Sequence, residues 1–143
     1  MHKKDIHTKL LDPKTRSTSG CTCTGVLLTP HHIILFNVGD SRTLIINEND
    51  KENGMLVFAS DDHKPDNKLE EERIKKSGGF VSMPPQTYIP RVNGQLALSR
   101  AFGDFQLKMS GKMQQHEQAV IVDPDVNIFE RSEATHIGIE SKY

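Results

Sequence analysis

Short runs of β-branched and other apolar residues, each bounded by turn-forming residues, make up most of the sequence from 24 to 59. The runs cover residues 24–29, 33–38, 43–46 and 55–59. Runs this short between turn residues are typical of β-strands, and connections of a few residues favour antiparallel neighbours. The run at 33–38 is apolar almost throughout, as expected of a strand covered on both faces. The sequence therefore predicts an antiparallel meander in this part of the chain.

One helix is expected to begin after Asn67. Glu70 follows three residues later, where its carboxylate can accept a hydrogen bond from the Asn67 backbone N–H, as in a capping box. Acidic residues precede basic ones along the segment, which matches the helix dipole, and Gly78 favours a left-handed end. Only Leu69 and Ile74 are apolar. The helix is therefore predicted to lie on the surface with a narrow buried stripe, as a lid or flap rather than a core element.

The second half of the chain has fewer regular patterns. Residues 119–122 are apolar, and Val126 and Ile128 alternate with polar residues, so two more short strands are predicted there. Near the C-terminus only Ile137 and Ile139 offer apolar anchors.

Length, charge and cysteine use limit the class of protein. At 143 residues the chain is long enough for one domain. Its 18 basic and 19 acidic residues argue against a nucleic-acid partner held by a basic surface. No apolar stretch approaches the ~20 residues of a membrane helix, and no secretory signal is recognisable, so no membrane partner is expected. Cys21 and Cys23 are expected to be small buried thiol side chains in a reducing compartment, which favours an intracellular location, cytoplasmic or nuclear.

Two acidic segments are candidate metal sites. Asp40 follows the apolar run 33–38, and a carboxylate at a strand end suits a hard cation such as Mg²⁺. A simple turn at 39–41 is the alternative that these residues alone favour. Asp61, Asp62 and His63 also offer ligand atoms, but adjacent side chains rarely point at one ion. A loop that leads into the helix is the favoured interpretation of that segment.

Other motifs give little support for catalysis. Arg100 and Asp104, four residues apart, are expected to form at most an exposed pair worth a few tenths of a kcal/mol. The histidines other than His63 show no ligand spacing and are expected to be solvated or structural. The sequence has no Gly-x-Ser-x-Gly or Gly-x-x-x-x-Gly-Lys motif, so neither a nucleophilic serine elbow nor a phosphate-binding loop is predicted.

Taken in order, however, several blocks between residues 19 and 132 resemble the metal-dependent type 2C (PPM) protein Ser/Thr phosphatases. The blocks are Ser19-Gly20-Cys21-Thr22, Asn37-Val38-Gly39-Asp40-Ser41-Arg42, Asp62-His63-Lys64-Pro65, residues 70–74, Gly78-Gly79, residues 91–104 and Asp123-Pro124-Asp125-Val126. Each block is short, and the specificity of the resemblance comes from their common order.

The resemblance implies the α+β fold of that family, a four-layer α-β-β-α sandwich of two antiparallel sheets flanked by helices. Here the sandwich would be partial and truncated at both ends, and the helix after Asn67 would belong to the flap beside the active site. Residues 19–132 would form the partial phosphatase domain. Residues 1–18 would be a polar tail or the remnant of a truncated element, and residues 133–143 a divergent C-terminal tail.

The resemblance also implies a chemistry. In the family two cations, magnesium or manganese, activate the water that attacks the phosphorus of a phosphorylated protein, and a third cation lies at the periphery. Asp40 resembles a ligand of the peripheral cation. The early Asp-Gly pair with its His, the phosphate-binding Arg and the late Asp-Gly-x-x-Asp block do not occur in this sequence. No catalytic residue is therefore assigned in this chain.

Two functions are expected on this basis. The first is protein Ser/Thr phosphatase activity of the complete domain, with little or no activity of this chain alone. The second is a non-catalytic, phosphatase-like module that binds phosphoproteins or a regulator through residues 67–91. Missing flanking elements would leave sheet edges and apolar faces uncovered, so marginal stability is expected unless a partner chain or the missing segments cover them.

Overall fold

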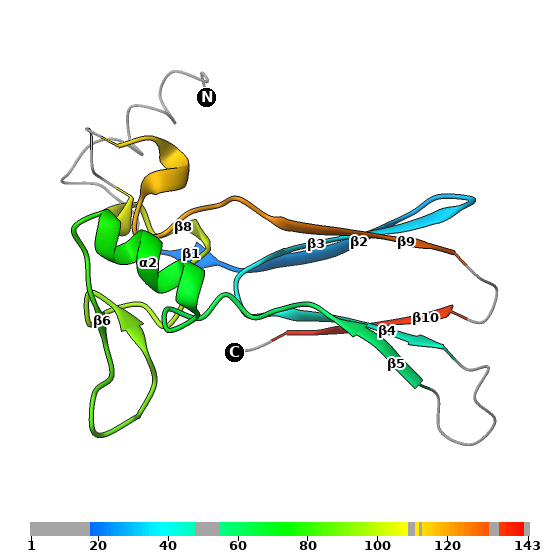
Figure 1. Cartoon of the computed structure of the whole chain (residues 1–143), viewed down its shortest axis with the longest axis horizontal. Helices are drawn as coiled ribbons and strands as arrows, with labels where there is room; N and C mark the ends of the chain where they lie inside the picture. Colours follow the sequence, from blue (N-terminus) through cyan, green and yellow to red (C-terminus); the bar gives the residue numbers. More distant parts are fainter. Residues whose placement is uncertain (1–17, 48–54, 109–110, 112, 132–134, 142–143) are drawn as a thin grey trace.

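The computed structural model describes residues 18–47, 55–108, 111, 113–131 and 135–141. Most of its strands form two three-stranded antiparallel sheets, which lie face to face as two layers (Figure 1). One sheet has the order β2 (Cys23–Leu28), β3 (His32–Val38), β9 (Asp125–Glu130). The other has the order β10 (Thr135–Glu140), β4 (Arg42–Asn47), β5 (Met55–Ala59).

The shorter elements gather beyond one end of these layers, together with helix α2 (Lys68–Lys76) (Figure 1). Two small antiparallel pairs form there, β1 (Gly20–Cys21) with β8 (Phe102–Gly103), and β6 (Val81–Ser82) with β7 (Arg91–Val92). Two 3₁₀ turns, η1 (Phe105–Leu107) and η2 (Gln115–Glu117), follow along the chain. No helix among the described residues has the length and apolar character needed to cross a membrane. The described part is mostly antiparallel sheet with one α-helix, in agreement with the expected α+β class.

The chain passes from one sheet to the other through residues 39–41. The hairpins β2–β3 and β4–β5 are antiparallel as predicted, but β3 and β4 are not hydrogen-bonded neighbours. The prediction of one meander is therefore wrong at this connection. Leu35 and Ile45 are both buried in the same core, which requires the two strands to face each other across the layers. Gly39 makes the turn with φ of +105°, and a Cβ there would lie 2.4 Å from Thr22 Cγ2.

One core lies between the two sheets and draws on both of them. Its members are Ile33, Leu35 and Ile45, with the partly buried Val26, Phe58, Phe129 and Ile137 packed against them. The rings of Phe58 and Phe129 are tilted, with centroids 4.9 Å apart. The opposite face of β3 is open within the described residues, where Phe36 is 36% exposed. The expectation of a strand covered on both faces is therefore not met there.

A second core lies under α2. Its buried residues are Ile74, Val92, Ala101, Leu107, Ala119 and Val120. Ile74 is completely buried, whereas Leu69, the other apolar residue of the helix, is 75% exposed. The helix was expected to bury a narrow apolar stripe, and this is confirmed at Ile74 but wrong at Leu69.

The start of α2 differs from the expected capping box. The Asn67 side chain makes no cap hydrogen bond and instead donates to the Asp62 carbonyl at 2.7 Å. Glu70 is directed away from the helix start into a buried ionic network, because two arginine side chains and a serine hydroxyl surround its carboxylate. The capping-box prediction is therefore wrong, although the helix begins where expected.

Two segments near the C-terminus also differ from expectation. Residues 119–122 were predicted to be a strand, but Ile121 makes only an isolated bridge to Arg100, and the segment fills the second core. Residues 135–140, which the sequence suggested were part of a tail, form β10 along β4, with Ile137 opposite Ile45. The expected N-terminal tail lies, except for residue 18, outside the described residues.

Candidate functional site

The connection between the two sheets places Asp40 in the lining of a cavity of about 700 Å³. The Asp40 side chain is 14% exposed, and its carboxylate forms an ion pair with Lys64. Arg91 and Asp104 also line the cavity. Burial raises the pKa of Asp104, although the positive charge of Lys108 acts in the opposite direction. The candidate metal ligand of the sequence analysis therefore lies on a cavity wall, with a lysine as its counter-ion.

His63 holds the two peptide groups that flank Gly39, the residue before Asp40. The His63 backbone N–H donates to the Gly39 carbonyl at 3.0 Å, and the Gly39 N–H donates to the His63 Nδ1 at 2.9 Å. The imidazole is buried, and its Nε2 lies 3.1 Å from Asp125 Oδ2. Because Nδ1 accepts a hydrogen bond it carries no proton, so Nε2–H is the donor to Asp125. His63 is therefore the neutral Nε2–H tautomer.

Hydroxyl groups fix the other side of the turn. The Thr22 and Ser41 side-chain oxygens lie 2.7 Å apart, and those of Thr24 and Thr43 are also 2.7 Å apart. Each pair joins a residue from the β2 side of the structure to one from the β4 side. These hydrogen bonds tie the two sheets together next to Asp40.

Asp62 does not contribute to a site around Asp40. Its Oδ1 accepts hydrogen bonds from Arg42 Nε and Nη2 at 3.1 and 3.0 Å. Asp62 and His63 thus have separate partners, one on β4 and one on β9. This agrees with the preferred interpretation of the segment as a loop that leads into the helix.

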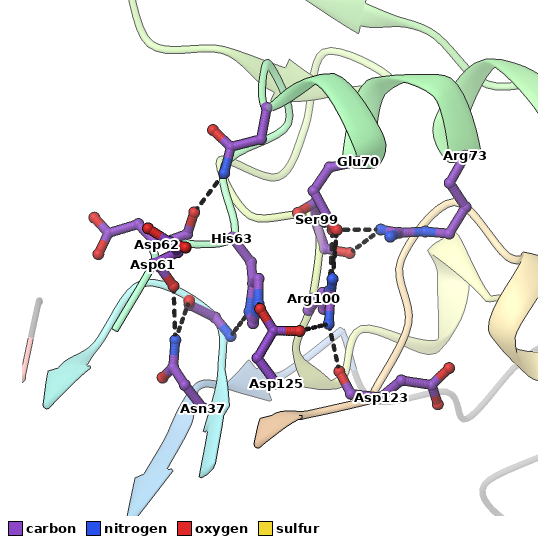
Figure 2. Close-up of polar contacts among 12 residues, drawn as sticks. Asn37, Asp61, Asp62, His63, Glu70, Arg73, Ser99, Arg100, Asp123 and Asp125 are labelled. Atoms are coloured by element: carbon purple, nitrogen blue, oxygen red, sulfur yellow. Dashed lines mark hydrogen bonds and ion pairs between the residues drawn. The ribbon is translucent and has the colours of Figure 1, made fainter. Parts of the chain in front are cut away.

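Glu70 of α2 is the centre of a buried ionic network (Figure 2). Its carboxylate accepts hydrogen bonds from Arg100 Nη2 at 2.7 Å, Arg73 Nη2 at 2.8 Å and Ser99 Oγ at 2.6 Å. Burial raises the pKa of Glu70, but the hydrogen bonds from Arg100, Arg73 and Ser99 outweigh it and lower the pKa from 4.5 to about 2. Glu70 is therefore ionised at neutral pH.

Arg100 connects this network to His63. Its Nη1 donates to Asp125 Oδ1 at 2.8 Å and to the Asp123 carbonyl at 2.9 Å, while Nε and Nη2 bind Glu70. Burial raises the pKa of Asp125, but the hydrogen bond from His63 and the charge of Arg100 lower it overall. A continuous path of polar contacts therefore runs from Glu70 through Arg100, Asp125 and His63 to Gly39 (Figure 2).

The Arg100 pairing differs from the expectation. Arg100 was expected to pair, if at all, with Asp104 in an exposed contact, but its partners are Glu70 and Asp125 and its side chain is only 14% exposed. Asp104 has φ of +47° and is buried next to Gly20. Sequence spacing gave no signal for Glu70–Arg100 or Arg100–Asp125, because the partners are 30 and 25 residues apart.

The described residues do not by themselves form a complete divalent-cation site. A Mg²⁺ or Mn²⁺ ion takes about six oxygen ligands and favours carboxylates. Asp40 supplies one carboxylate, and Lys64 already neutralises its charge. Within the described ranges no group of three or more His, Cys, Asp or Glu side chains is arranged to hold a metal. The donor set present here does not fit a complete metal centre.

Comparison with protein families gives a match to the model for Protein phosphatase 2C over residues 1–139. Human Protein phosphatase 1A is 42% identical over 131 residues, which cover 90% of this chain and 31% of that protein. Protein phosphatase ppm-1.A of Caenorhabditis elegans is 40% identical over 116 residues, which cover 81% of this chain and 22% of that protein. The chain thus spans less than a third of the length of these relatives.

Solved structures give the same result. The crystal structure of a phosphatase from Toxoplasma gondii superposes with a TM-score of 0.66 at 38% identity, covering 76% of this chain and 30% of that one. Serine-threonine phosphatase 2C from Toxoplasma gondii superposes with a TM-score of 0.69 at 21% identity, covering 94% of this chain and 42% of that one. The second match supports the fold alone.

Proposed function

The chain belongs to the protein phosphatase 2C family, as its ordered motifs predict, and on this basis we propose that it is part of a domain that hydrolyses phosphoserine and phosphothreonine in proteins. The observation that carries the proposal is the family match over residues 1–139, which includes the turn that holds Asp40. Phosphorylated proteins are the proposed substrates. An intracellular location, cytoplasmic or nuclear, is proposed. Cys21 is exposed and Cys23 half-buried, so the expectation that both are buried is wrong, but their free thiols are compatible with such a location.

In that domain Asp40 would contribute a carboxylate to a peripheral Mg²⁺ or Mn²⁺ ion. What this chain's own residues do is fix the carboxylate: Gly39 permits the turn, and His63 binds both the Gly39 N–H and the Gly39 carbonyl. No catalytic step is assigned to the described residues, because their donor set lacks the further carboxylates of a metal centre.

The complete domain is proposed to be the four-layer α-β-β-α sandwich of the family. The support is the apolar surface on the described sheets. Leu28 and Ile128 are 51% and 63% exposed on the β2–β3–β9 sheet, and Leu56 and Ile139 are 55% and 60% exposed on the other sheet. Side chains of this kind are normally covered, and helices of the complete domain would cover them.

The 143-residue chain alone is proposed to have little or no phosphatase activity. The test is hydrolysis of a phosphothreonine peptide in the presence of Mn²⁺, with intact human Protein phosphatase 1A as the reference. Turnover by this chain near that of the reference would contradict the proposal.

A chimera tests the phosphatase assignment itself. The matching segment of human Protein phosphatase 1A is exchanged for this chain's segment, and the chimera is assayed with the same peptide. Mn²⁺-dependent turnover is expected. A folded chimera without turnover would contradict the assignment, and circular dichroism distinguishes it from a misfolded one.

One observation favours the second candidate, a non-catalytic module that binds phosphoproteins or a regulator. The segment that follows α2 exposes large apolar side chains: Phe80 by 56%, Met83 by 54% and Tyr88 by 75%. Exposed apolar residues close together often mark a protein-binding surface. Under this alternative the chimera does not turn over the phosphopeptide, whereas the chain retains it in a binding assay.

A further inference from the structure

We propose that His63 is a positioning residue: in its Nε2–H tautomer the imidazole fixes the Val38–Gly39 peptide, one residue before Asp40, and the ion pairs of Asp125 and Arg100 link that tautomer to helix α2. The importance given to Asp40 rests on the proposed function. The positioning itself is a property of the folded chain and is tested without metal or substrate.

The direction of the Asp40 side chain depends on the two peptide groups that flank Gly39, Val38–Gly39 and Gly39–Asp40. Both hydrogen-bonding groups of Gly39 bind His63, the N–H to the imidazole and the carbonyl to the backbone N–H. The Asn37 side chain donates to the same carbonyl at 3.1 Å. A ligand group has to be held to within about 0.5 Å and 10–20° of its productive geometry, so a rotation of these peptide groups would move the Asp40 carboxylate out of place.

Only one imidazole tautomer is compatible with these contacts. With the proton on Nδ1, that N–H would face the Gly39 N–H, and Nε2 would place a lone pair against the Asp125 carboxylate. With the proton on Nε2, each nitrogen has the partner that it needs, at 2.9 Å from Gly39 N and 3.1 Å from Asp125 Oδ2. The carboxylate of Asp125 therefore selects the tautomer that binds Gly39.

Arg100 connects Asp125, which selects the tautomer, to helix α2. The fork of its guanidinium binds Asp125 through Nη1 and Glu70 through Nε and Nη2, so both carboxylates are held by one planar group. Glu70 and Arg100 are 4% and 14% exposed, whereas Asp125 is 47% exposed and is the most hydrated link. A displacement of α2 would therefore act on His63 through Arg100 and Asp125.

Two substitutions separate the two functions of the imidazole. In His63→Asn the amide oxygen replaces Nδ1 as the acceptor for the Gly39 N–H, and contact with Asp125 is lost. In His63→Gln the amide nitrogen reaches toward Asp125 as a donor, and the Gly39 N–H has no acceptor. The two variants are matched controls for each other, because both replace the ring by a neutral amide.

The measurement is amide hydrogen exchange of Gly39 in the 143-residue chain, expressed as a ratio to the exchange of Leu35 in the middle of β3. The ratio removes any change in overall stability. We expect His63→Asn to leave the ratio close to wild type. We expect His63→Gln to raise it roughly tenfold, the factor for loss of one buried hydrogen bond. Equal ratios in the two variants would overturn the proposal.

The wild-type chain and Arg100→Lys supply independent arms. The imidazole ¹⁵N and ¹³C chemical shifts of wild-type His63 are expected to show the neutral Nε2–H tautomer at pH 7.5, and an Nδ1–H tautomer or an imidazolium would overturn the proposal without any variant. Arg100→Lys keeps the charge but has no fork to hold both carboxylates. It is expected to raise the exchange ratio of Gly39 to Leu35 about threefold, because the hydrogen bond of the Gly39 N–H is weakened rather than lost. An unchanged ratio would overturn the link to α2. Since none of these arms uses turnover, an inactive chimera would contradict the proposed function and leave these results intact.

Discussion

Arg100→Met is the substitution that most directly tests whether the ionic network stabilises the chain. The wild-type guanidinium binds Glu70 with contacts of 2.7, 3.1 and 3.2 Å and Asp125 with one of 2.8 Å. Methionine fills a similar volume but donates no hydrogen bond. Glu70 keeps its bonds from Arg73 and Ser99, so its charge is left only partly compensated in a buried site.

The expected loss follows from the exposure of the two partners. A charge-assisted hydrogen bond contributes about 1.5–3 kcal/mol when buried, which applies to Glu70. The contact with Asp125 is worth less, about 0.5–1 kcal/mol, because that side chain is 47% exposed. Arg100→Met is therefore expected to lower the free energy of unfolding by about 2–4 kcal/mol, a large part of the stability of a small domain.

The assay is urea denaturation followed by circular dichroism, with a double-mutant cycle as control. The double variant Glu70→Met, Arg100→Met is expected to lose less stability than the sum of the two single losses. The difference from that sum is expected to be about 1–3 kcal/mol, because the double variant leaves no unpaired carboxylate at position 70. Arg100→Lys is expected to lie between wild type and Arg100→Met. If Arg100→Met unfolds within 0.5 kcal/mol of wild type, or if the cycle is additive, the network does not stabilise the fold in the manner proposed.

Three further predictions concern other residues. The pKa of Glu70 is about 2 in the folded chain against 4.5 ordinarily, so its ionised carboxylate contributes about 3 kcal/mol to the free energy of unfolding above pH 4.5, and this contribution is lost as the pH falls toward 2. Unfolding free energies measured over this pH range should show the loss, and Glu70→Gln should remove it. Gly39→Ala is expected to destabilise by more than 2 kcal/mol, since its Cβ would lie 2.4 Å from a threonine methyl, whereas Gly78→Ala, at φ of +84° with open space around it, should lose about 1 kcal/mol. Ile74→Ala is expected to lower the free energy of unfolding by about 2–5 kcal/mol and Leu69→Ala by less than 0.5 kcal/mol, because the first side chain is fully buried and the second is 75% exposed. Equal losses in thermal melts would contradict the orientation of the helix with Ile74 toward the core.

How well the sequence predicted each feature depends on how far apart along the chain the interacting residues are. The hairpin β2–β3 and the position of α2 follow from local periodicity and turn residues. The assignment of β3 and β4 to different sheets depends on how Leu35 and Ile45 share one core, which no local pattern records. The candidate metal ligand Asp40 was found through the ordered family motifs, and its place on a turn matches the local pattern.

The network around Glu70 could not be predicted from local rules. Glu70 occupies a position where a capping box is common, and only the tertiary fold brings Arg100 to it from 30 residues away. The same holds for His63, whose imidazole reaches Asp125 across 62 residues. Helix rules describe neighbours three or four residues apart, so they gave Glu70 a capping role and Arg100 an exposed partner. The partners of the buried ionic groups could be identified only from the three-dimensional structure.

Calorimetric titration of the 143-residue chain with Mn²⁺ tests most directly whether the chain carries only the peripheral part of a phosphatase 2C metal centre. Asp40 is the ligand position that we propose for this chain, and its carboxylate is paired with Lys64. At most one weak binding event is expected, and Asp40→Asn should abolish it. Two tightly bound Mn²⁺ ions per chain would show that a complete binuclear centre forms within these residues and would contradict the proposal.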